Sequence, residues 1–595
     1  MIIKRIFDIL DNYKFNFPEK RDAFAVRQGG EWTLVSQNDY YDTSRYVSFG
    51  LLSLGLKPSD NVMTVFSNNL PQWNFIDMGI LQIGAVHVSV HSSLSDNDLS
   101  YILKEINPGL IIVSDDKVYQ TIVPLLEDSL GKRPVYVVED PAGERSFGQL
   151  IDLGKKNAEK LDKKFTELHN SISENQLATI IYTSGTTGFP KGVMLSHKNI
   201  VSNALSAAKL QPLRVHDKVL SFLPLCHVYE RTANYQFQFH GTGIYYSDGV
   251  KSLAQDFLVV KPDGITTVPR LLEKVLININ LKGGEYRGLK KKIFLWSMKF
   301  GYRYNPTKKH HLVYRLKLLF ASRLVYDKWK KMLGGNLRYI GCGGAPIDQR
   351  IERIFWAAGI PVFQGYGLTE CSPLVALNRM PLSEMLIGTV GPLIENVDVM
   401  IAQDGEILCR GPNIMTGYFR QEKLTKETIV DGWLHTGDLG MMTDGKFLKI
   451  TGRKKEMFKT SYGKYIVPSV LENKLKQSVL VEQAMVVGEG EKYAAAILSP
   501  NFEYLYQWLN KKGISPSSND ELISLAEVRQ SFEDEIKKIN RELGRYERII
   551  QFRLIPDVWG TGSGELSVSL KLKRSFLTEK YKSLIQSIYE EEDYQ

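Results

Sequence analysis

The sequence predicts an α/β protein: a large N-terminal domain of parallel sheets and helices, a small β-rich subdomain, and a smaller C-terminal α+β domain. Three observations carry this prediction. Short runs that are apolar at every position alternate with helical patterns, as in covered parallel sheets. After about residue 385 the pattern changes to short strands punctuated by glycine. From about residue 452, strands accompany one long helix, so we expect domains at 1–451 and 452–595.

The expected parallel strands are all short and rich in Val, Ile and Leu. In chain order they are Leu110–Val113, Val135–Val138, Ala178–Tyr182, Val219–Leu223, Ile265–Val268, Leu337–Ile340 and Pro361–Gln364. Helices are expected between them, for instance at Pro269–Ile277 and Ile347–Ala358. The uncharged run Met78–Val90 is shorter than the roughly 20 residues that span a bilayer. It predicts a buried helix followed by a strand.

The last third of the chain carries the other two expected regions. Gly405–Leu408 and Lys446–Leu448 predict strands of the β-rich subdomain. In the C-terminal domain, strands are expected at Gln483–Val487 and Ala494–Leu498. A helix is expected at Leu525–Leu543, where apolar residues recur at helical spacing.

Composition and charge exclude several classes. Of 595 residues, 43% are hydrophobic and 24% charged, which argues against disorder and fibrous repeats. The four cysteines are widely spaced and form no CxxC pair, so neither a disulfide framework nor a cysteine-based zinc site is expected. We expect a protein of the reducing cytoplasm, with peripheral contact to the inner membrane face left open.

The segment directly after the strand expected at Ala178–Tyr182 is rich in glycine and hydroxyl residues. Its members are Thr183, Ser184, Gly185, Thr186, Thr187, Gly188 and, three residues on, Lys191. Glycines let backbone N–H groups approach an anion, hydroxyls add donors and the lysine adds positive charge. A polyphosphate cradle is therefore predicted, against the alternative of an ordinary turn. It is not a Walker A loop, because Pro190 replaces the second glycine and Gly192 follows the lysine.

Two further motifs follow expected strands. Gly343-Gly344-Ala345-Pro346 offers small residues on which a flat base could lie, although such a turn is common. Gln364-Gly365-Tyr366-Gly367-Leu368-Thr369-Glu370 places an aromatic ring among glycines and ends in a carboxylate suited to Mg²⁺, which also takes phosphate oxygens and water. The alternative for the carboxylate is an acid in the first turn of a helix.

Two motifs stand in the last third of the chain. Gly432–Asp438 ends in a carboxylate that can accept two ribose hydroxyls, and Arg453 follows in a basic run. Glu565–Arg574 contains Lys571, with Lys573 two residues on. In isolation, each of these charges is equally well read as a solvated surface group.

In this order the motifs resemble those of the adenylate-forming enzymes, which include acyl-CoA synthetases, luciferases and peptide-synthetase adenylation domains. The resemblance runs from about residue 15 to 585. Leu223–Arg231, which contains His227, is similar to the long-chain fatty acid–CoA ligases in particular. The adenylate-forming enzyme fold, with a mobile C-terminal domain, is therefore expected.

The resemblance also implies roles. The segment of Thr183–Gly188 with Lys191 would hold the β- and γ-phosphates, and Gly344, Ala345 and Pro346 would border adenine. Gln364, Gly365, Tyr366 and Gly367 would complete the adenine site, Thr369 would bind the α-phosphate and Glu370 would hold Mg²⁺. Asp438 and Arg453 would bind ribose, His227 would lie near the acyl carboxylate, Gly463 would border the pantetheine channel, and Lys571 would serve adenylation. Each of these residues stands in this sequence at the matching position of the family's motif.

Three details depart from the family or stay open. Gly452 stands where many relatives have an acid, and glycine there leaves rotation of the C-terminal domain possible. Tyr462 replaces a small residue beside Gly463, and Lys573 is close enough to be mistaken for Lys571. Aromatic residues after His227 line either an acyl tunnel or the core: Tyr235, Phe237, Phe239, Tyr245 and Tyr246.

The reaction that this resemblance implies has two steps. A fatty carboxylate attacks the α-phosphorus of ATP to give acyl-adenylate and pyrophosphate, and the thiol of CoA then displaces AMP. ATP, Mg²⁺, CoA and a long-chain fatty acid are the expected cofactor and substrates. Two alternatives remain: a ligase that loads an acyl carrier protein or uses another acid, and a non-catalytic lipid-binding relative.

Positive charge is concentrated between Lys282 and Met332. This stretch holds eleven lysines and four arginines against Glu285 and Asp327, a net charge of +13, whereas the whole chain carries +9. Two basic, aromatic-rich helices are expected on either side of Asn305-Pro306. They predict either contact with an anionic membrane surface, with the aromatics buried, or a solvated helical pair that covers the core. No nucleic-acid motif accompanies the charge, and no nucleic-acid partner is expected.

Overall fold

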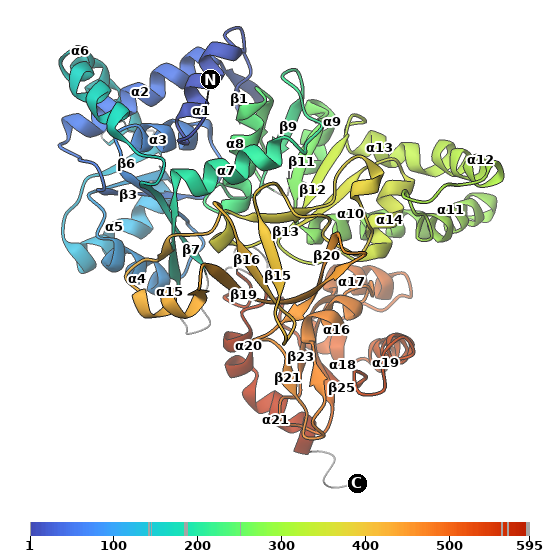
Figure 1. Ribbon diagram of the computed structural model, residues 1–595. Coiled ribbons are helices and arrows are strands. Elements are labelled where there is room, and N and C mark those ends of the chain that lie inside the picture. The colour runs from blue at the N-terminus through green and yellow to red at the C-terminus, as the bar shows by residue number, and fades with distance from the viewer. Residues whose placement is uncertain are drawn as a thin grey trace. The chain divides into compact units, whose positions relative to one another are not determined.

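The computed structural model describes residues 2–140, 143, 145–183, 189–249, 252–560, 563–567 and 571–590. It confirms the α/β class (Figure 1). Two mixed sheets with helices against their faces make up most of the N-terminal part, here named sheet A and sheet B. A three-stranded mixed sheet near the C-terminus is named sheet C.

Sheet A has most of its strands in parallel. Its order is β14 (Leu374–Leu377), β13 (Val362–Gly367), β12 (Tyr339–Cys342), β11 (Gly264–Thr267), β9 (Lys218–Ser221), β10 (Gly243–Tyr246), β1 (Phe24–Gln28) and β2 (Glu31–Val35). The strands from β13 to β1 run parallel, and the edge strands β14 and β2 are antiparallel to their neighbours.

Helices pack against sheet A through apolar side chains. One buried cluster joins Leu220, Ile265 and Ile340 of the strands to Phe257 and Ile354 of the helices. The helices in that region are α8 (Val228–Phe239), α9 (Leu253–Val260), α10 (Pro269–Gly284), α11 (Gly288–Gly301), α12 (Leu312–Ala321), α13 (Asp327–Met332) and α14 (Gln349–Ala357). Pro at the first turn starts α10, as its fixed φ allows.

Sheet B holds the strand that precedes the glycine-rich segment. Its order is β17 (Gly417–Tyr418), β8 (Lys191–Ser196), β7 (Leu177–Thr183), β4 (Val86–His91), β3 (Asn61–Phe66), β5 (Leu110–Asp115) and β6 (Val135–Glu139). Strands β7, β4, β3, β5 and β6 run parallel, whereas β8 is antiparallel to both of its neighbours.

Helices cover both faces of sheet B. They are α1 (Asp8–Asn16), α2 (Gln37–Ser53), α3 (Pro71–Leu81), α4 (Asp96–Ile106), α5 (Asp116–Leu130), α6 (Phe147–Ser171) and α7 (His197–Ala208). Helices α2, α3 and α6 pack together, and α4 and α5 pack together on the other face (Figure 1). At the crossing of α2 and α6, a Cβ on Gly154 would lie 1.9 Å from the carbonyl oxygen of Tyr46, so this close approach requires glycine.

The β-rich region follows sheet A in the chain. Its sheet contains β15 (Asp398–Ile401), β16 (Glu406–Arg410), β18 (Ile429–Val430), β19 (Trp433–Thr443) and β20 (Phe447–Arg453), with α15 (Glu422–Thr428) between β17 and β18. The structure divides into two compact units, of which the first comprises 1–400, 408–436 and 442–449, and the second 401–407, 437–441 and 450–595. Gly452 lies inside β20, where a Cβ would meet Val467 at 2.7 Å.

Sheet C forms the core of the second unit. Its order is β23 (Val481–Val487), β24 (Ala494–Pro500) and β25 (Ile549–Leu554), and β21 (Phe458–Lys459) pairs with β22 (Tyr465–Ile466) in a hairpin nearby in the chain. Its helices are α16 (Pro468–Leu475), α17 (Phe502–Asn510), α18 (Asn519–Ser524), α19 (Ala526–Asn540), α20 (Arg574–Lys580) and α21 (Lys582–Glu590). Phe532 and Ile536 of α19 pack against this core, as the helical spacing predicted.

The predicted elements are confirmed with shifted ends. The strand predicted at Val219–Leu223 ends at Ser221, because the side chain of Asn69 binds the carbonyl of Leu223 and Pro224 has no N–H to donate. The strand predicted at Leu337–Ile340 begins only at Tyr339 and continues through Gly341 to Cys342. Within the part of the chain that the structure describes, no helix has the length and apolar character needed to cross a membrane.

Candidate active site

Four neighbouring strands of sheet A, β9, β11, β12 and β13, end at the same edge. They run parallel, with Thr267 paired to Cys342 and Cys342 to Gln364. Gly343–Pro346 follows β12, Gln364–Gly367 forms the end of β13, and the loop to His227 follows β9. Ligands of open α/β sheets bind beyond the carboxyl ends of the strands. The fold therefore brings these three predicted motifs together.

The small residues at this edge are required by the backbone. Gly344 has a φ of +82°, a conformation that favours glycine. A Cβ on Gly367 would lie 1.9 Å from the carbonyl oxygen of Pro373, so no other residue fits there. Gly344, Ala345 and Pro346 are exposed, which leaves an accessible surface beside the end of β12.

Neighbouring side chains hold the loops of this edge in place. The hydroxyl of Tyr229 donates to the carbonyl of Gly341 in β12, at 2.9 Å. Asn69 accepts a hydrogen bond from the backbone of Leu225 and donates to that of Leu223, at 3.1 and 2.7 Å. His227 is half-buried and directly precedes α8, two residues after the loop position that Asn69 binds. Sequence reasoning missed Asn69, which no motif marks.

The predicted phosphate segment, Thr183–Gly188 with Lys191, stands in the chain between the paired strands β7 and β8. Thr183, the last residue of β7, pairs across the hairpin with Lys191, the first residue of β8. Ser184, Gly185, Thr186, Thr187 and Gly188 lie outside the described residues. The prediction that a strand leads directly into this segment is confirmed.

Glu370 is joined to the same hairpin by a residue that the sequence did not indicate. The hydroxyl of Tyr418 in β17 donates to Oε1 of Glu370 at 2.8 Å, and the ammonium of Lys191 lies 5.6 Å from the centre of the Tyr418 ring. The backbone of Met415 also donates to the carbonyl of Glu370, at 2.9 Å. Burial and the adjacent Glu370 carboxylate raise the pKa of Tyr418, which keeps the phenol protonated as a donor.

The donor set at Glu370 fits Mg²⁺ that is shared with phosphate groups. Among the described residues, no three His, Cys, Asp or Glu side chains gather as a complete metal site. Mg²⁺ commonly takes one or two protein carboxylates and completes its shell with substrate phosphates and water. One oriented carboxylate near a basic residue of the phosphate segment meets that requirement.

Asp438 and Arg453, predicted as partners, form an ion pair in the second unit. Nε of Arg453 donates to Oδ1 of Asp438 at 2.8 Å, and the arginine also lies 3.8 Å from Glu456. Asp438 is buried, whereas half of the arginine side chain is exposed. The pair thus presents a fixed carboxylate with a charged neighbour, as binding of two hydroxyls would need.

Lys571 belongs to the second unit and begins the described stretch that leads into α20. The backbone groups of Lys571 and Ser567 are joined at 2.8 Å, and Leu566 bridges Leu572, while 568–570 lie outside the described residues. Lys571 is exposed. Lys573 occupies the N-cap position of α20, without a capping hydrogen bond from its side chain. Gly463, with a φ of +76°, makes the turn between β21 and β22.

A buried ionic network links helix α8, which packs on sheet A, to sheet B. The guanidinium of Arg231 in α8 donates to Asp77 of α3, to Thr179 of β7 at 2.6 Å and to Tyr235 at 2.8 Å. His87 of β4 binds the same aspartate at 2.6 Å. Arg231, Asp77 and His87 are all fully buried. The network connects the helix after His227 to the strand that leads into the phosphate segment.

Glu230, next to Arg231, is a second buried acid. It accepts hydrogen bonds from Ser221 at the end of β9 and Thr266 near the end of β11, at 2.6 and 2.5 Å. Burial raises the pKa of Glu230 to about 7. The aromatic residues that follow are core residues: Tyr235, Phe237, Tyr245 and Tyr246 are buried, and the hydroxyl of Tyr235 donates to Asp77.

Comparison with known proteins agrees with this arrangement. Residues 15–419 match the family described as "AMP-binding enzyme", and residues 456–593 match the "AMP-binding enzyme C-terminal domain". The long-chain-fatty-acid–CoA ligase FadD15 of Mycobacterium bovis is 32% identical over 570 residues, 95% of this chain and 93% of that protein. Human long-chain-fatty-acid–CoA ligase 1 is 30% identical over 595 residues, 94% of this chain and 82% of that protein.

A solved structure confirms the fold. The A domain of the carboxylic acid reductase from Segniliparus rugosus, in complex with AMP and a co-purified carboxylic acid, superposes with a TM-score of 0.75 at 20% identity. The superposition covers 99% of this chain and 94% of that one. Because the family match over residues 15–419 takes in more than half of the chain, the chain belongs to the AMP-binding enzyme family.

Proposed function

We propose that the protein, an AMP-forming acid–CoA ligase, activates long-chain fatty acids. The observation that carries this proposal is the meeting of Gly343–Pro346, Gln364–Gly367 and the His227 loop at one edge of sheet A. The similarity to long-chain-fatty-acid–CoA ligases over almost the whole chain supports the choice of substrate. In this proposal, residues 1–451 bind ATP and the acid, and residues 452–595 carry the adenylation lysine.

In the first step, an oxygen of the fatty carboxylate attacks the α-phosphorus of ATP, and pyrophosphate leaves. Lys191 and the segment 183–188 hold the β- and γ-phosphates, and Thr369 binds the α-phosphate. Glu370, oriented by Tyr418, would hold Mg²⁺, which neutralises charge on phosphate oxygens when bound. The protein forms no covalent bond to the acid, so positioning and charge neutralisation supply the rate enhancement.

The nucleoside and the acid take the remaining residues. Tyr366 stacks on adenine beside Gly344, Ala345 and Pro346, and Asp438 with Arg453 binds the ribose hydroxyls. His227 lies near the acyl carboxylate, and Lys571 stabilises the charge that develops at the α-phosphate. In the second step, the CoA thiol attacks the acyl carbonyl carbon, AMP leaves with the bonding electron pair, and Gly463 borders the path of pantetheine.

A panel of acids tests the substrate and the acceptor together. Acetate, laurate, palmitate and oleate are each supplied with ATP, Mg²⁺ and either CoA or holo-acyl carrier protein, and the thioesters are identified by mass. We expect acyl-CoA from palmitate or oleate at the highest kcat/KM. Preference for acetate would contradict the long-chain assignment, and thioester on the carrier protein alone would contradict CoA as the acceptor. Absence of pyrophosphate with every acid would favour a non-catalytic lipid-binding protein.

A further inference from the structure

The two helices on either side of Asn305-Pro306 expose most of their large apolar side chains. In α12, Leu312, Val313, Leu316, Leu319 and Phe320 are each between 54% and 70% exposed, and Ala321 alone is buried. In α11, Leu289, Leu295 and Trp296 are exposed as well. These eight residues are named the apolar hairpin face. Single exposed apolar residues are ordinary, but four of these residues, Trp296, Val313, Leu316 and Phe320, line one groove, and a contiguous apolar patch marks a binding surface.

The prediction of two helices is confirmed, but the prediction that their aromatics are buried holds only in part. Phe294 of α11 and Trp329 of α13 are buried, whereas Trp296 and Phe320 are exposed. Part of the apolar surface of α11 and α12 is therefore not covered by the rest of the protein.

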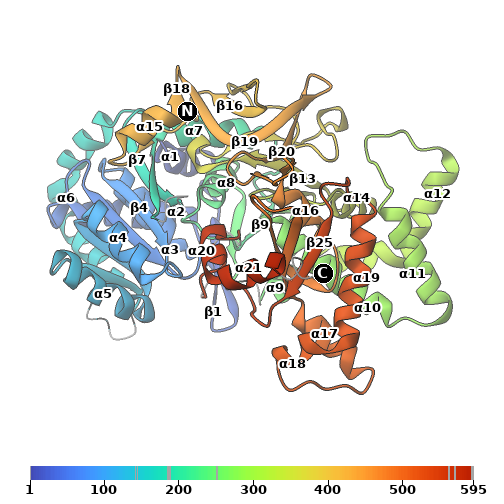
Figure 2. The same ribbon diagram turned by 90° about the horizontal axis from the view of Figure 1, so that it is seen from below.

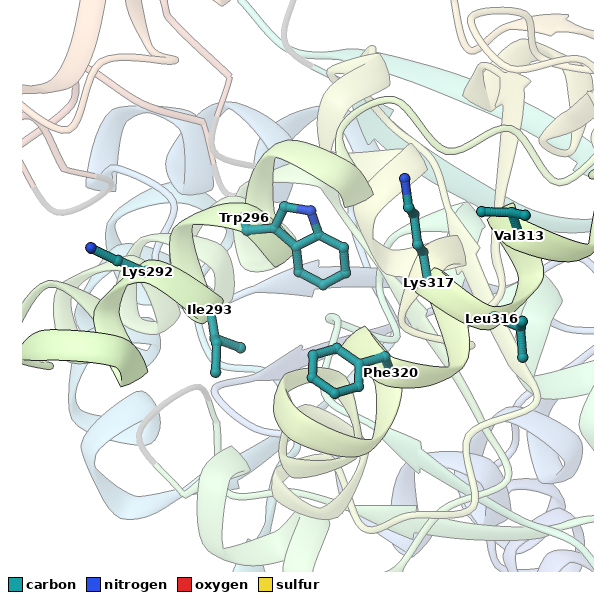
Figure 3. A pocket seen from close by; sticks show the side chains of 7 residues that line it. All are labelled: Lys292, Ile293, Trp296, Val313, Leu316, Lys317 and Phe320. Atoms are coloured by element: carbon teal, nitrogen blue, oxygen red, sulfur yellow. The ribbon is translucent and has the colours of Figure 1, made fainter.

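An open groove runs between the two helices. It has a volume of about 460 Å³ and is lined by Lys292, Ile293, Trp296, Val313, Leu316, Lys317 and Phe320. In Figure 3 the rings of Trp296 and Phe320 are neighbours in an edge-on arrangement, the ammonium of Lys292 points away from the apolar side chains, and that of Lys317 points away from Leu316 and Phe320. The two ring centres lie 6.2 Å apart. Both ribbon views show α11 and α12 side by side (Figure 2).

The opposite side of the pair is firmly attached to sheet A's helices. Phe294 packs against Gly283 of α10, and α11 packs on α14. The hydroxyl of Tyr326 donates to the carbonyl of Ser297 at 2.5 Å. The rings of His310 and Tyr314 stack with centres 4.2 Å apart, which ties the connecting loop to α12. The apolar hairpin face is thus presented by an anchored support.

The charge around this face selects the partner. The stretch 282–332 carries a net charge of +13, and Lys290, Lys291, Lys292, Lys299 and Lys317 are exposed on α11 and α12. A second copy of this chain would bring like charge against like charge. Nucleic acid would pair with the lysines but leave the leucines in water. An anionic bilayer satisfies both, because apolar side chains enter the acyl boundary while lysines stay among the headgroups.

We propose that the apolar hairpin face docks the protein on an anionic phospholipid membrane, with Leu312, Leu316, Leu319 and Phe320 inserted at the boundary between headgroups and acyl chains. Trp296 lies at the interfacial level that tryptophan favours. Docking would place the enzyme where long-chain acids dissolve, and that consequence rests on the proposed function, whereas the docking itself does not.

The test is flotation of the full chain with vesicles of phosphatidylcholine alone or with phosphatidylglycerol added, at low and high salt. We expect binding to anionic vesicles that weakens as salt rises. Reversal of Lys290, Lys291 and Lys292 to Glu should lower the vesicle partition coefficient about a hundredfold, since each lysine near the surface contributes about 1 kcal/mol. Leu316→Ser with Phe320→Ser should lower it at least tenfold by removing the inserted side chains.

Matched control variants lie elsewhere in the first unit. Lys160, Lys163 and Lys164 are exposed on α6, and their reversal to Glu gives the same change in charge. Leu34→Ser removes a half-exposed apolar side chain from β2. Both controls should bind vesicles as the unmodified protein does. Equal loss in control and test variants, or no binding to anionic vesicles at low salt, would overturn the proposal.

A separate readout distinguishes this proposal from the proposed function. Palmitate in detergent micelles is offered with ATP and CoA, so that the substrate does not depend on a bilayer. The hairpin variants should then form palmitoyl-CoA at the unmodified rate. Vesicle binding without any acyl-CoA formation would refute the function and leave docking in place. Self-association that Phe320→Ser abolishes, without vesicle binding, would assign the face to a second copy and refute docking.

Discussion

The hydroxyl of Tyr418 donates a 2.8 Å hydrogen bond to Oε1 of Glu370, and the same ring lies beside the ammonium of Lys191. One side chain on the short strand β17 thus connects two motifs that are about 180 residues apart in the chain. Loss of a partner that orients a metal-ligating carboxylate typically costs about 10- to 100-fold in metal affinity or activity.

Removal of that hydroxyl tests whether Glu370 holds Mg²⁺. Tyr418→Phe keeps the ring beside Lys191 but releases the carboxylate, so apparent Mg²⁺ affinity in pyrophosphate release should fall about 10- to 100-fold. The measurement is initial rate against Mg²⁺ concentration, with palmitate and ATP saturating. Tyr465→Phe, an exposed tyrosine of the second unit, is the control. An unchanged Mg²⁺ dependence in Tyr418→Phe would remove Glu370 as a metal ligand.

Lys571 is expected to act in the first step only. Lys571→Ala should cost about 2–4 kcal/mol of transition-state stabilisation in pyrophosphate release, the range for one electrostatic donor. Thioester formation from supplied palmitoyl-adenylate should be nearly unchanged. Lys573→Ala is the matched control, because that residue lies two positions away and its side chain makes no capping hydrogen bond to α20. If Lys573→Ala loses the first step and Lys571→Ala does not, the two residues exchange roles.

The stability of the first unit should depend on the ionisation of Glu230. The folded pKa of about 7 lies above the ordinary 4.5, so the unfolded chain releases the proton first as pH rises. As pH rises from about 4.5 to 7, this group therefore lowers the free energy of unfolding by about 1.4 kcal/mol per pH unit. Above pH 7 its contribution no longer changes. Glu230→Gln has no ionisable carboxyl group at this position. Its free energy of unfolding, measured with urea, should therefore fall less as pH rises. Parallel pH profiles for both proteins would contradict the raised pKa.

The buried Arg231–Asp77 pair should be far more sensitive than a surface pair. Arg231→Met leaves the aspartate uncompensated and should lower the free energy of unfolding by about 3–5 kcal/mol. Lys209→Met breaks the exposed Lys209–Glu395 pair and should cost no more than about 1 kcal/mol. Urea unfolding monitored by tryptophan fluorescence compares the two. Similar losses would show that Arg231 is not an energetic link between the sheets.

The sequence predicts those parts of the fold that rest on local patterns. The strands at Leu110–Val113 and Ala178–Tyr182 follow from continuous apolar runs and the helix of Leu525–Leu543 from helical apolar spacing, and the structure confirms all three with shifted ends. The sequence marks Gly344 as a small residue of the base site and Gly367 as a glycine beside Tyr366. The structure adds that the backbone itself favours glycine at both positions.

Contacts between segments that are distant in the chain could not be predicted from local sequence patterns. Tyr418, Asn69 and Asp77 carry no motif, and each acts only because the sheets bring it to Glu370, Leu223 or Arg231. Arg231 stands inside the recognised Leu223–Arg231 stretch, but its role depends on a buried partner in another helix. The exposure of Leu312–Phe320 was likewise hidden, because an apolar helical pattern predicts burial.

Exchange of labelled pyrophosphate into ATP tests the central claim, that a long-chain acid reacts with ATP before CoA takes part. The unmodified protein is incubated with ATP, Mg²⁺, labelled pyrophosphate and palmitate, without CoA. Reversible formation of palmitoyl-adenylate predicts label in ATP that depends on palmitate, is weak with acetate and is strongly reduced in Lys571→Ala. Exchange that requires CoA, or hydrolysis of ATP to ADP in place of AMP, would contradict the account.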